Sequence, residues 1–530
     1  MTFFRHPTLV RRSTLALASL TALSLFAIAV RPVEAATLIQ IGSDTYTNPD
    51  SQHATQVEPD SFAWGSTIVA ATQSGRFTDG GSSNLNFSTS TDGGNTWTTG
   101  GLPGITKNNP AAPGPYDRVS DPSVAYNAKY NAWLVAGLAL VQSGTAVNGA
   151  GVTVNRSTNG GLAWLNPVVV TNSNLGNIDK DWIVCDNTPS SPFYGNCYVE
   201  WDDNGDGNRI YMSTSTDGGQ TWGPRLKPAN NATGLGGQPL VQPSGTVIVP
   251  IDNANETVLM AFTSSNGGAS WNSTVNVTTI RTHTVAGGLR SGPLPSAEID
   301  GSGKVYVVWQ DCRFRTQCRA NDIVMTTSTN GTNWTPVTRV PIDATGSAVD
   351  HFLPGIAVDH TTSGAGTRIA IGYYYYPNRN CTASTCQLFQ GYVSSASGGA
   401  TWSVTAPIAG PMTLAWLANT TQGRMVGDYM STSFVGTAAL PVFALANANN
   451  GSTFNEAMYT SLGLGASRTA ASVEVPMVTD PSFESESAPA PVPGGVPVNQ
   501  DSTASGNADE TAPTGSAASA TQIVVALTAR

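Results

Sequence analysis

The chain has 530 residues, of which 40% are hydrophobic, only 11% are charged and 55 are glycine. Its formal net charge of −10 argues against nucleic acid or an anionic membrane surface as a partner. Low charge together with many turn-forming residues is typical of an extracellular all-β protein.

The first 35 residues have the pattern of an export signal. Basic residues precede an apolar run over residues 15–30, and a small-residue cleavage site ends at Ala35. We therefore expect residues 1–35 to be removed and the mature protein to be secreted or held at the cell surface, with an uncleaved signal anchor as the alternative. The mature chain would carry 21 basic and 34 acidic residues, a net charge of −13, and no further membrane span.

One eight-residue pattern, Ser-x-Asp-x-Gly-x-x-Trp, recurs along the chain at steps of 49 to 67 residues. An Asp or Asn in such a turn caps backbone N–H groups, the glycines supply positive φ, and the Trp packs the hairpin against its sheet. The spacing fits one four-stranded sheet per copy. The copies are Ser90 to Trp97, Ser157 to Trp164, Ser215 to Trp222, Ser264 to Trp271, Ser395 to Trp402, and a shorter one from Ser328 to Trp334.

A strand that opens at a Pro or acidic residue precedes each box, and one more such strand follows the last box. The opening strands begin near Glu58, Asp121, Asp181, Gln238, Leu294, Leu353 and Gly427. We therefore predict an all-β fold over residues 36–464, a single β-propeller of four-stranded blades with Asp-box turns. Seven blades are favoured and six are the alternative. Residues 37–41 are expected to supply the outer strand of the last blade, so that no sheet edge stays open.

Six cysteines fall into three pairs that are close in sequence. In an exported protein such local pairs favour disulfides that pin loops over metal ligation, because no His or Cys-x-x-Cys lies nearby. The predicted bridges are Cys185–Cys197, Cys312–Cys318 and Cys381–Cys386.

Residues 465–530 change in composition to Ser, Ala, Pro, Gly and acidic residues without a periodic apolar pattern. Such a segment cannot bury a core, so we predict a disordered tail or spacer.

The segment over residues 202–207 reads Asp-Asp-Asn-Gly-Asp-Gly, which matches the start of a calcium loop. Asp202, Asn204 and Asp206 are the candidate ligands. The twelfth position is Ser213 and not Glu, so the bidentate ligand is missing. No cofactor is expected to be required; a structural calcium ion is the candidate here, and an ordinary hairpin turn is the alternative.

The boxes resemble the Asp-box, or BNR, repeats of the sialidase-like β-propellers, over residues 37–464. The resemblance implies a site above the central channel, a carbohydrate or glycoconjugate as partner and an exo-alpha-sialidase-like glycoside hydrolase that acts as a monomer. In that family the boxes lie away from the active site, so they identify architecture and not chemistry.

A sialidase uses three arginines to bind the substrate carboxylate, a Tyr nucleophile activated by a Glu, and an Asp as acid and base. By resemblance, Asp79 is the acid/base residue and Tyr429 is the nucleophile. The arginine candidates are Arg76, Arg290, Arg313 (or Arg315) and Arg424. Further polar residues at strand starts are expected to line the central funnel, or else only to cap backbone groups: Glu58, Asp60, Arg118, Asp121, Lys180, Asp181, Asp350, His351 and Asp428.

Two parts of the standard sialidase motif are missing. The family's Arg-Ile-Pro is replaced by Val57-Glu58-Pro59, and Leu294 stands where the activating Glu is expected. Without that base a Tyr is a poor nucleophile near neutral pH. The rival functions are a non-catalytic carbohydrate-binding or adhesion propeller, a polysaccharide lyase on the same scaffold, and a glycosidase with two carboxylates in the funnel.

Overall fold

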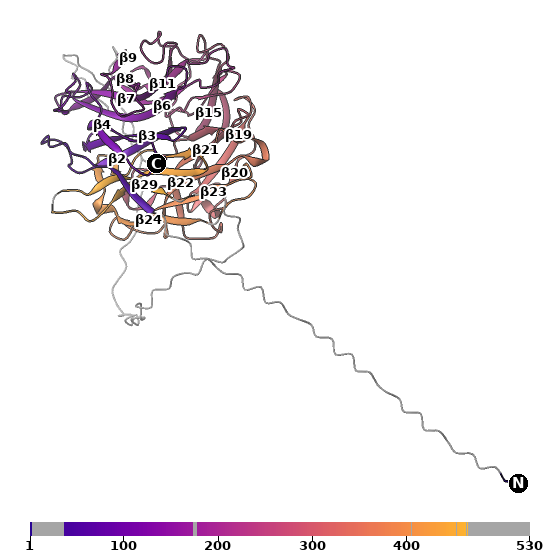
Figure 1. Cartoon of the computed structure of the whole chain (residues 1–530). Coiled ribbons are helices and arrows are strands. Elements are labelled where there is room, and N and C mark those ends of the chain that lie inside the picture. Colours follow the sequence, from indigo (N-terminus) through magenta and orange to yellow (C-terminus); the bar gives the residue numbers. More distant parts are fainter. Residues whose placement is uncertain (3–36, 173–176, 404, 452, 463, 465–530) are drawn as a thin grey trace, which may run out of the picture. The chain divides into compact units, whose positions relative to one another are not determined.

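The computed structural model describes residues 1–2, 37–172, 177–403, 405–451, 453–462 and 464 (Figure 1). The predicted signal and the predicted tail therefore lie outside the described residues, apart from Met1 and Thr2. Residues 1–35 form a unit of their own, and the unit that follows is described here by itself. Within the described ranges no helix is both long and apolar enough to cross a membrane.

The strands form antiparallel meanders in chain order, and each opening strand predicted from the sequence is the first strand of a meander. The earlier meanders are β2 (Gln56–Trp64), β3 (Thr67–Arg76), β4 (Ser82–Ser90) and β5 (Thr98–Gly101); β6 (Arg118–Asn127), β7 (Ala132–Ser143), β8 (Ala146–Ser157) and β9 (Val168–Asn172); β10 (Ile178–Cys185), β11 (Cys197–Asp203) and β12 (Arg209–Ser215); and β13 (Leu240–Val241), β14 (Val247–Asp252), β15 (Val258–Ser264) and β16 (Val275–Thr279).

The later meanders follow the same rule. They are β17 (Ser296–Ile299), β18 (Val305–Asp311), β19 (Asp322–Ser328) and β20 (Thr338–Arg339); β21 (Asp350–Val358), β22 (Ile369–Tyr376), β23 (Gln387–Ser395) and β24 (Ala406–Thr413); and β27 (Ser431–Val435), β28 (Ala438–Ala446) and β29 (Glu456–Leu462). A hairpin of β25 (Ala418–Thr420) and β26 (Gly423–Met425) precedes the last one. Short 3-10 turns lie at Asn204–Asp206 (η1), Ala286–Gly288 (η2), Thr316–Cys318 (η3), Gly364–Gly366 (η4) and Leu414–Trp416 (η5).

The N-terminal strand β1 (Thr37–Gly42) completes the last sheet, as predicted. It pairs antiparallel with β29, with Thr37 opposite Leu462 and Gln40 opposite Tyr459. The sheet order is β1-β29-β28-β27, so the first and last strands of the described fold are hydrogen-bonded to each other. The open edge of β29 is covered in this way.

The third meander has three strands where four were predicted. Residues 223–228 run Gly-Pro-Arg-Leu-Lys-Pro beside β12, and only Leu226 exchanges backbone hydrogen bonds with Met212. A proline has no N–H to give to a sheet ladder, so Pro224 and Pro228 stop the fourth strand on either side of that pair.

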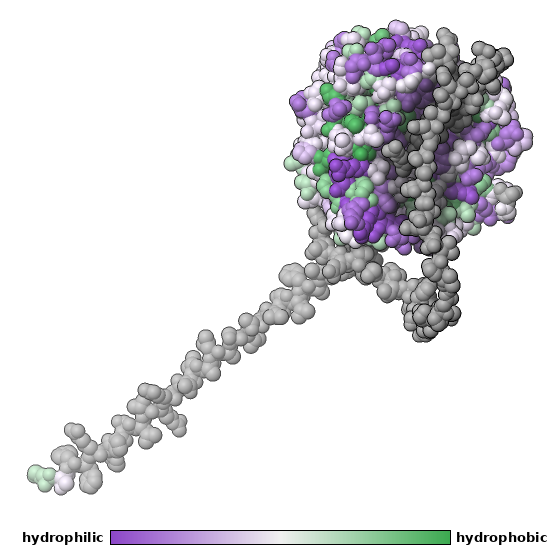
Figure 2. All heavy atoms as spheres, turned by 180° about the vertical axis from the view of Figure 1, so that it is seen from behind, coloured by the Kyte–Doolittle hydropathy of each residue, from purple (hydrophilic) through white to green (hydrophobic). Residues whose placement is uncertain are grey.

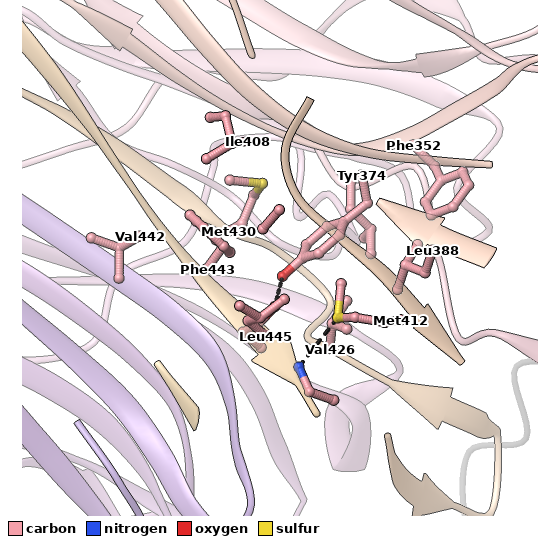
Figure 3. Close-up of a cluster of buried hydrophobic side chains, with 14 of the residues drawn as sticks. Phe352, Tyr374, Leu388, Ile408, Met412, Val426, Met430, Val442, Phe443 and Leu445 are labelled. Carbon is pink, nitrogen blue, oxygen red and sulfur yellow. Dashed lines mark hydrogen bonds between the residues drawn. The ribbon is translucent and has the colours of Figure 1, made fainter. Parts of the chain in front are cut away.

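The core lies between successive meanders, where their faces pack together. One cluster joins Phe352, Tyr374 and Leu388 of the β21–β24 sheet to Val442 and Phe443 of β28 (Figure 3). The phenol of Tyr374 donates a hydrogen bond to the carbonyl of Ala444 at 2.8 Å. On the face in Figure 2 the coloured surface is mainly hydrophilic, with small hydrophobic groups.

The first strands of the meanders follow one another around a common cavity. Contacts link β2 to β6, β6 to β10, β10 to β13, β13 to β17, β17 to β21, β21 to β27, and β27 back to β2. A cavity of about 320 Å³ has lining residues from each of these strands. We call it the central cavity.

The boxes make the hydrogen bonds that their sequence predicts. In the first box the Ser90 hydroxyl accepts from Gly94 N–H at 2.8 Å, Asp92 accepts from Thr96 N–H at 2.9 Å, and the Trp97 indole donates to the Gly94 carbonyl at 2.9 Å. The indole bond recurs at Trp164, Trp334 and Trp402, whereas the indole N–H groups of Trp222 and Trp271 have no partner among the described residues. The box therefore closes each hairpin from within.

The three predicted disulfides are present. Cys185–Cys197 joins directly opposed residues of β10 and β11, Cys312–Cys318 encloses η3, and Cys381–Cys386 closes the loop between β22 and β23. No free cysteine remains among the described residues, which include all six.

Mass mapping of the non-reduced protein should find these three bridges and no others, because each pair closes a short local loop. Peptides cleaved between the paired cysteines should separate only after reduction. A bridge between cysteines of different pairs would contradict the meander boundaries given above.

Candidate functional site

Several first strands carry a β-bulge at their start, and there a residue other than glycine takes a left-handed backbone conformation. The φ values are 56° at Glu58, 49° at Asp121, 41° at Lys180 and 49° at Leu353. Such backbone costs about 1–3 kcal/mol per residue and clusters at functional sites. At three of them a proline follows, although a residue before proline normally adopts an extended conformation.

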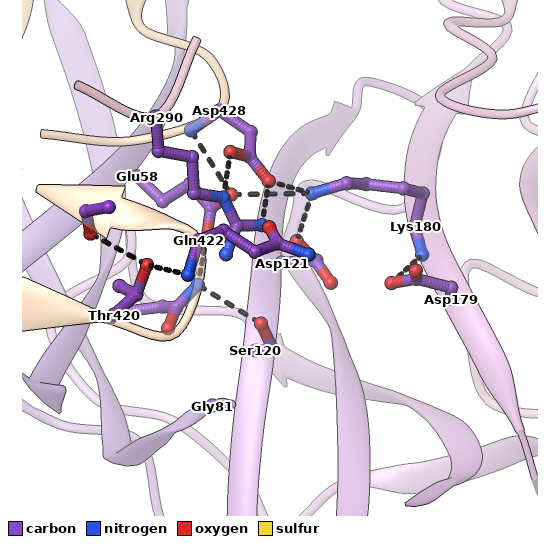
Figure 4. Close-up of polar contacts among 12 residues, drawn as sticks. Glu58, Gly81, Ser120, Asp121, Asp179, Lys180, Arg290, Thr420, Gln422 and Asp428 are labelled. Carbon is purple, nitrogen blue, oxygen red and sulfur yellow. Dashed lines mark hydrogen bonds and ion pairs between the residues drawn. The ribbon is translucent and has the colours of Figure 1, made fainter. Parts of the chain in front are cut away.

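Charged side chains from three first strands and from two connecting segments meet at one point near these bulges (Figure 4). The Lys180 ammonium lies 3.3 Å from Glu58, 3.0 Å from Asp121 and 2.8 Å from Asp428. Arg290 donates to Asp428 with two nitrogens, Nε at 2.6 Å and Nη2. We call these five residues the central ion network.

Burial and pairing set the charges of this network. Burial raises the pKa of Glu58 to about 8, although Lys180 opposes that shift. Burial also disfavours ionised Asp428, but Arg290 and Lys180 outweigh it and hold its pKa far below the usual range. For Lys180, burial is outweighed by Asp121, Asp428 and Glu58, so its pKa is well above normal and the ammonium stays charged.

A pocket of about 530 Å³ lies against the network. Its apolar wall comes from β7 and β8, with Leu138, Leu140 and Val147. The other lining groups include charged side chains: Arg76, Asp79, Asp121, Asp179, Lys180 and Arg290. We call this the acidic pocket.

Asp79 and Arg76 reach the acidic pocket from the segment that joins β3 to β4. Asp79 ion-pairs with Arg118 at 2.5 Å, and its side chain is 43% exposed. Arg76 is buried and donates to the Gly81 carbonyl at 2.7 Å and to Gln73 at 3.1 Å, but it makes no ion pair with any carboxylate of the described residues. Burial, reinforced by nearby Arg290, lowers the pKa of Arg76.

Tyr429 does not line the acidic pocket. Its ring is buried edge-on to Trp182, and its hydroxyl donates to the Pro122 carbonyl at 3.1 Å. Burial and the surrounding acids, Glu58 first among them, raise its pKa well above the normal value. This phenol is therefore protonated and directed at a backbone group.

Four other candidates also lie apart from the acidic pocket. Arg313 pairs with Asp311 and lies over Trp309, and Arg424 donates to the Leu417 carbonyl. Buried His351 packs against Tyr373, and burial lowers its pKa to about 4. Asp60 lines the central cavity and accepts from Val124 N–H at 2.7 Å.

The calcium-loop residues have separate surroundings. Asp202 is fully buried, and neither of its oxygens has a hydrogen-bond partner among the described residues. Asp206 accepts from the Tyr211 hydroxyl at 2.7 Å and lies 3.8 Å from Arg209. Asp203, which the sequence did not single out, caps η1 by accepting from Gly205 N–H. Calcium binding by Asp202, Asn204 and Asp206 stays a prediction.

Arg118 and Lys180 were expected from the sequence as polar residues of the funnel, without a catalytic or metal-binding role. Asp179 was not singled out, although it stands next to Lys180 at the start of an opening strand. The pairing of Arg118 with Asp79 has no local signal, because the two residues lie 39 positions apart in different meanders.

Comparison with known families agrees with the repeat pattern. The family described as "BNR repeat-like domain" matches residues 137–355. This part of the chain is similar to a BNR repeat-like domain. The match confirms the resemblance to sialidase-like BNR proteins that the boxes indicated. No curated protein sequence matches the chain.

Solved structures similar to this chain share little sequence with it. A protein of unknown function from Dyadobacter fermentans is 16% identical, with 67% of this chain and 98% of that chain covered and a TM-score of 0.43. The NanB sialidase of Streptococcus pneumoniae is 12% identical, with 80% and 70% covered and a TM-score of 0.41. A PL25 ulvan lyase is 11% identical, with 81% and 96% covered and a TM-score of 0.46.

The buried acid Asp60 gives the stability of the fold a pH dependence that can be measured. Burial raises its pKa to about 7, against about 4 in an unfolded chain. Folded Asp60 therefore keeps a proton that the unfolded chain releases, so its contribution to stability is complete below about pH 4 and is lost as the pH rises through about 7.

Replacing Asp60→Asn should therefore reduce the fall in unfolding free energy between about pH 5 and pH 8, measured by urea denaturation at both pH values. Asp92→Asn is the matched control, because hydrogen bonds from Thr96 and Ser90 lower the pKa of Asp92 to about 2 and it does not titrate in this range. If the unfolding free energy of Asp60→Asn fell with pH as steeply as that of the parent, a raised pKa of Asp60 would be contradicted.

Proposed function

We propose that the chain is a secreted, carbohydrate-active β-propeller of seven blades whose acidic pocket binds a saccharide. The cyclic contacts of the first strands and the cavity that they share support the blade number. The export signal predicted at residues 1–35 and the three disulfides support secretion, because disulfides persist in oxidising compartments.

The composition of the acidic pocket carries the proposal of a saccharide ligand. A sugar presents apolar C–H faces and hydroxyl groups, and the pocket offers an apolar wall together with carboxylates and guanidinium groups. Its volume of about 530 Å³ lies in the range of small-molecule sites. Arg76 has no carboxylate partner among the described residues, so its guanidinium group can donate a charge-assisted hydrogen bond to an acidic group of the sugar.

Within this pocket Asp79 is the acid/base candidate, since its carboxylate is partly exposed and is oriented by Arg118. Sialidase chemistry of the standard kind is not supported. The hydroxyl of Tyr429 is directed at the Pro122 carbonyl and away from the pocket. Arg290 is already paired with the carboxylate of Asp428, whereas a sialidase needs its arginines for the carboxylate of the substrate.

A binding function without turnover is the second candidate. Two of the acids that line the pocket support it, because Asp121 is already paired with Lys180 and Asp79 with Arg118. A carboxylate held in an ion pair loses part of its ability to transfer protons.

The reaction can be tested with aryl glycosides and uronate polymers as substrates for the purified protein. Replacing Asp79→Asn should lower kcat by about 10²–10⁴-fold, the usual contribution of a general acid or base, whereas Tyr429→Phe should stay within a few-fold of the parent. Activity that survives Asp79→Asn would remove Asp79 from the mechanism. Saccharide binding in a glycan array without turnover of any substrate would establish the second candidate.

Aryl sialosides should be turned over poorly or not at all by the same preparation. The activating Glu and the first arginine of the motif are absent, and together they would stabilise the transition state by several kcal/mol. Sialidase activity that Tyr429→Phe abolishes would contradict the assignment of Tyr429 to the interior.

A further inference from the structure

Beside the central ion network lies a group of acids that make no ion pair among the described residues. Within the network and its surroundings, Glu58, Asp121 and Asp428 face three bases, Lys180, Arg290 and Arg76. Four more acids lie just beside them on β10 and β11: Asp179, Asp181, Glu200 and Asp202. Among the described residues none of these four makes an ion pair.

Asp202 is one of three acids in this group, with Asp181 and Glu200, whose carboxylate oxygens both lack a hydrogen-bond partner among the described residues. Its side chain is fully buried, and both carboxylate oxygens are without a hydrogen-bond partner in the described part of the chain. A buried carboxylate in this state is either protonated or neutralised by a bound cation. Asp202 lies opposite Asp179 in the pairing of β10 with β11, and the carboxyl of Asp179 acts electrostatically on it.

Asn204 brings a third oxygen-bearing side chain beside Asp179. Its amide nitrogen lies 3.4 Å from an oxygen of Asp179, and a rotation of the amide would turn its oxygen to that point instead. Asp179 and Asn204 both line the acidic pocket, so an ion could enter from solvent.

We propose that Asp179, Asp202 and Asn204 bind a hard divalent cation, of the calcium type, at the base of the acidic pocket. Two carboxylates and an amide oxygen form an all-oxygen donor set, which suits calcium or magnesium and lacks the nitrogen and sulfur ligands that zinc prefers. The ion pairs of Lys180 go to three other carboxylates, although its charge also acts on Asp179 and Asp202 from a greater distance.

The proposal changes one ligand of the calcium loop expected from the sequence. Asp206 is engaged with Tyr211 and lies near Arg209, so it is unsuited to meet Asp202 around an ion. Asp179 takes its place, from a neighbouring strand and not from the loop itself. The site depends on two strands of one sheet and is independent of whether a saccharide is processed.

The test uses the full chain, freed of metal with a chelator and titrated with CaCl₂ or MgCl₂ while its Tm and binding heat are followed. Ligand binding raises stability with the ratio of its concentration to Kd. We expect calcium to raise the Tm by several degrees with half-saturation between about 0.1 μM and 1 mM, the range of protein calcium sites. No shift with either ion would overturn the proposal.

Three variants decide which residues bind. Asp179→Asn and Asp202→Asn should each lose the calcium-dependent shift, whereas Asp206→Asn should keep all of it. In the presence of chelator, the Tm of Asp202→Asn should be no lower than that of the parent, because the change removes an unpaired buried acid. This comparison separates a loss of calcium binding from misfolding. Loss of the shift in Asp206→Asn with retention in Asp179→Asn would place the ion in the loop and overturn the proposal.

Discussion

The buried ion pairs of Lys180 link parts of the fold that are far apart in sequence. Its ammonium is bound by carboxylates from the starts of β2 and β6 and from the segment before β27, while Asp428 is shared with Arg290 from the segment before β17. A buried charge is tolerated only when it is paired, and loss of one partner from such a set costs about 3–5 kcal/mol. The network therefore fixes the positions of several sheets relative to one another at the point where the acidic pocket opens.

The fold was largely predictable because its signals are local. The Asp box is a single turn in which Ser90, Asp92 and Trp97 bond to groups within four residues of themselves. Each disulfide joins cysteines at most 12 positions apart. The pairing of β1 with β29 was predicted from the need to cover a sheet edge. The missing strand of the third meander shows the limit, since Pro224 and Pro228 remove the donors that a fourth strand needs.

The site was only partly predictable because its interactions join residues far apart in sequence. Arg290 and Asp428 are 138 positions apart. Arg290 therefore binds a carboxylate of the protein itself, whereas the resemblance had given it the role of binding a substrate carboxylate. Tyr429 has the residue type and position of a nucleophile, but the fold points its hydroxyl at the Pro122 carbonyl. Asp79 and Arg76 do reach the same pocket, because both belong to one short segment that ends a strand.

The pairing of β1 with β29 also constrains how the protein folds. Gln40 and Tyr459, which share a side-chain hydrogen bond, are 419 positions apart. The first strand of the fold must therefore stay unpaired until nearly all of the repeats have been synthesised, and closing so long a loop is slow because its entropy cost comes before the contacts that reward it. Closure of the last sheet is thus a late step of folding, and until then the exposed edge of β1 has to be kept from pairing with other chains.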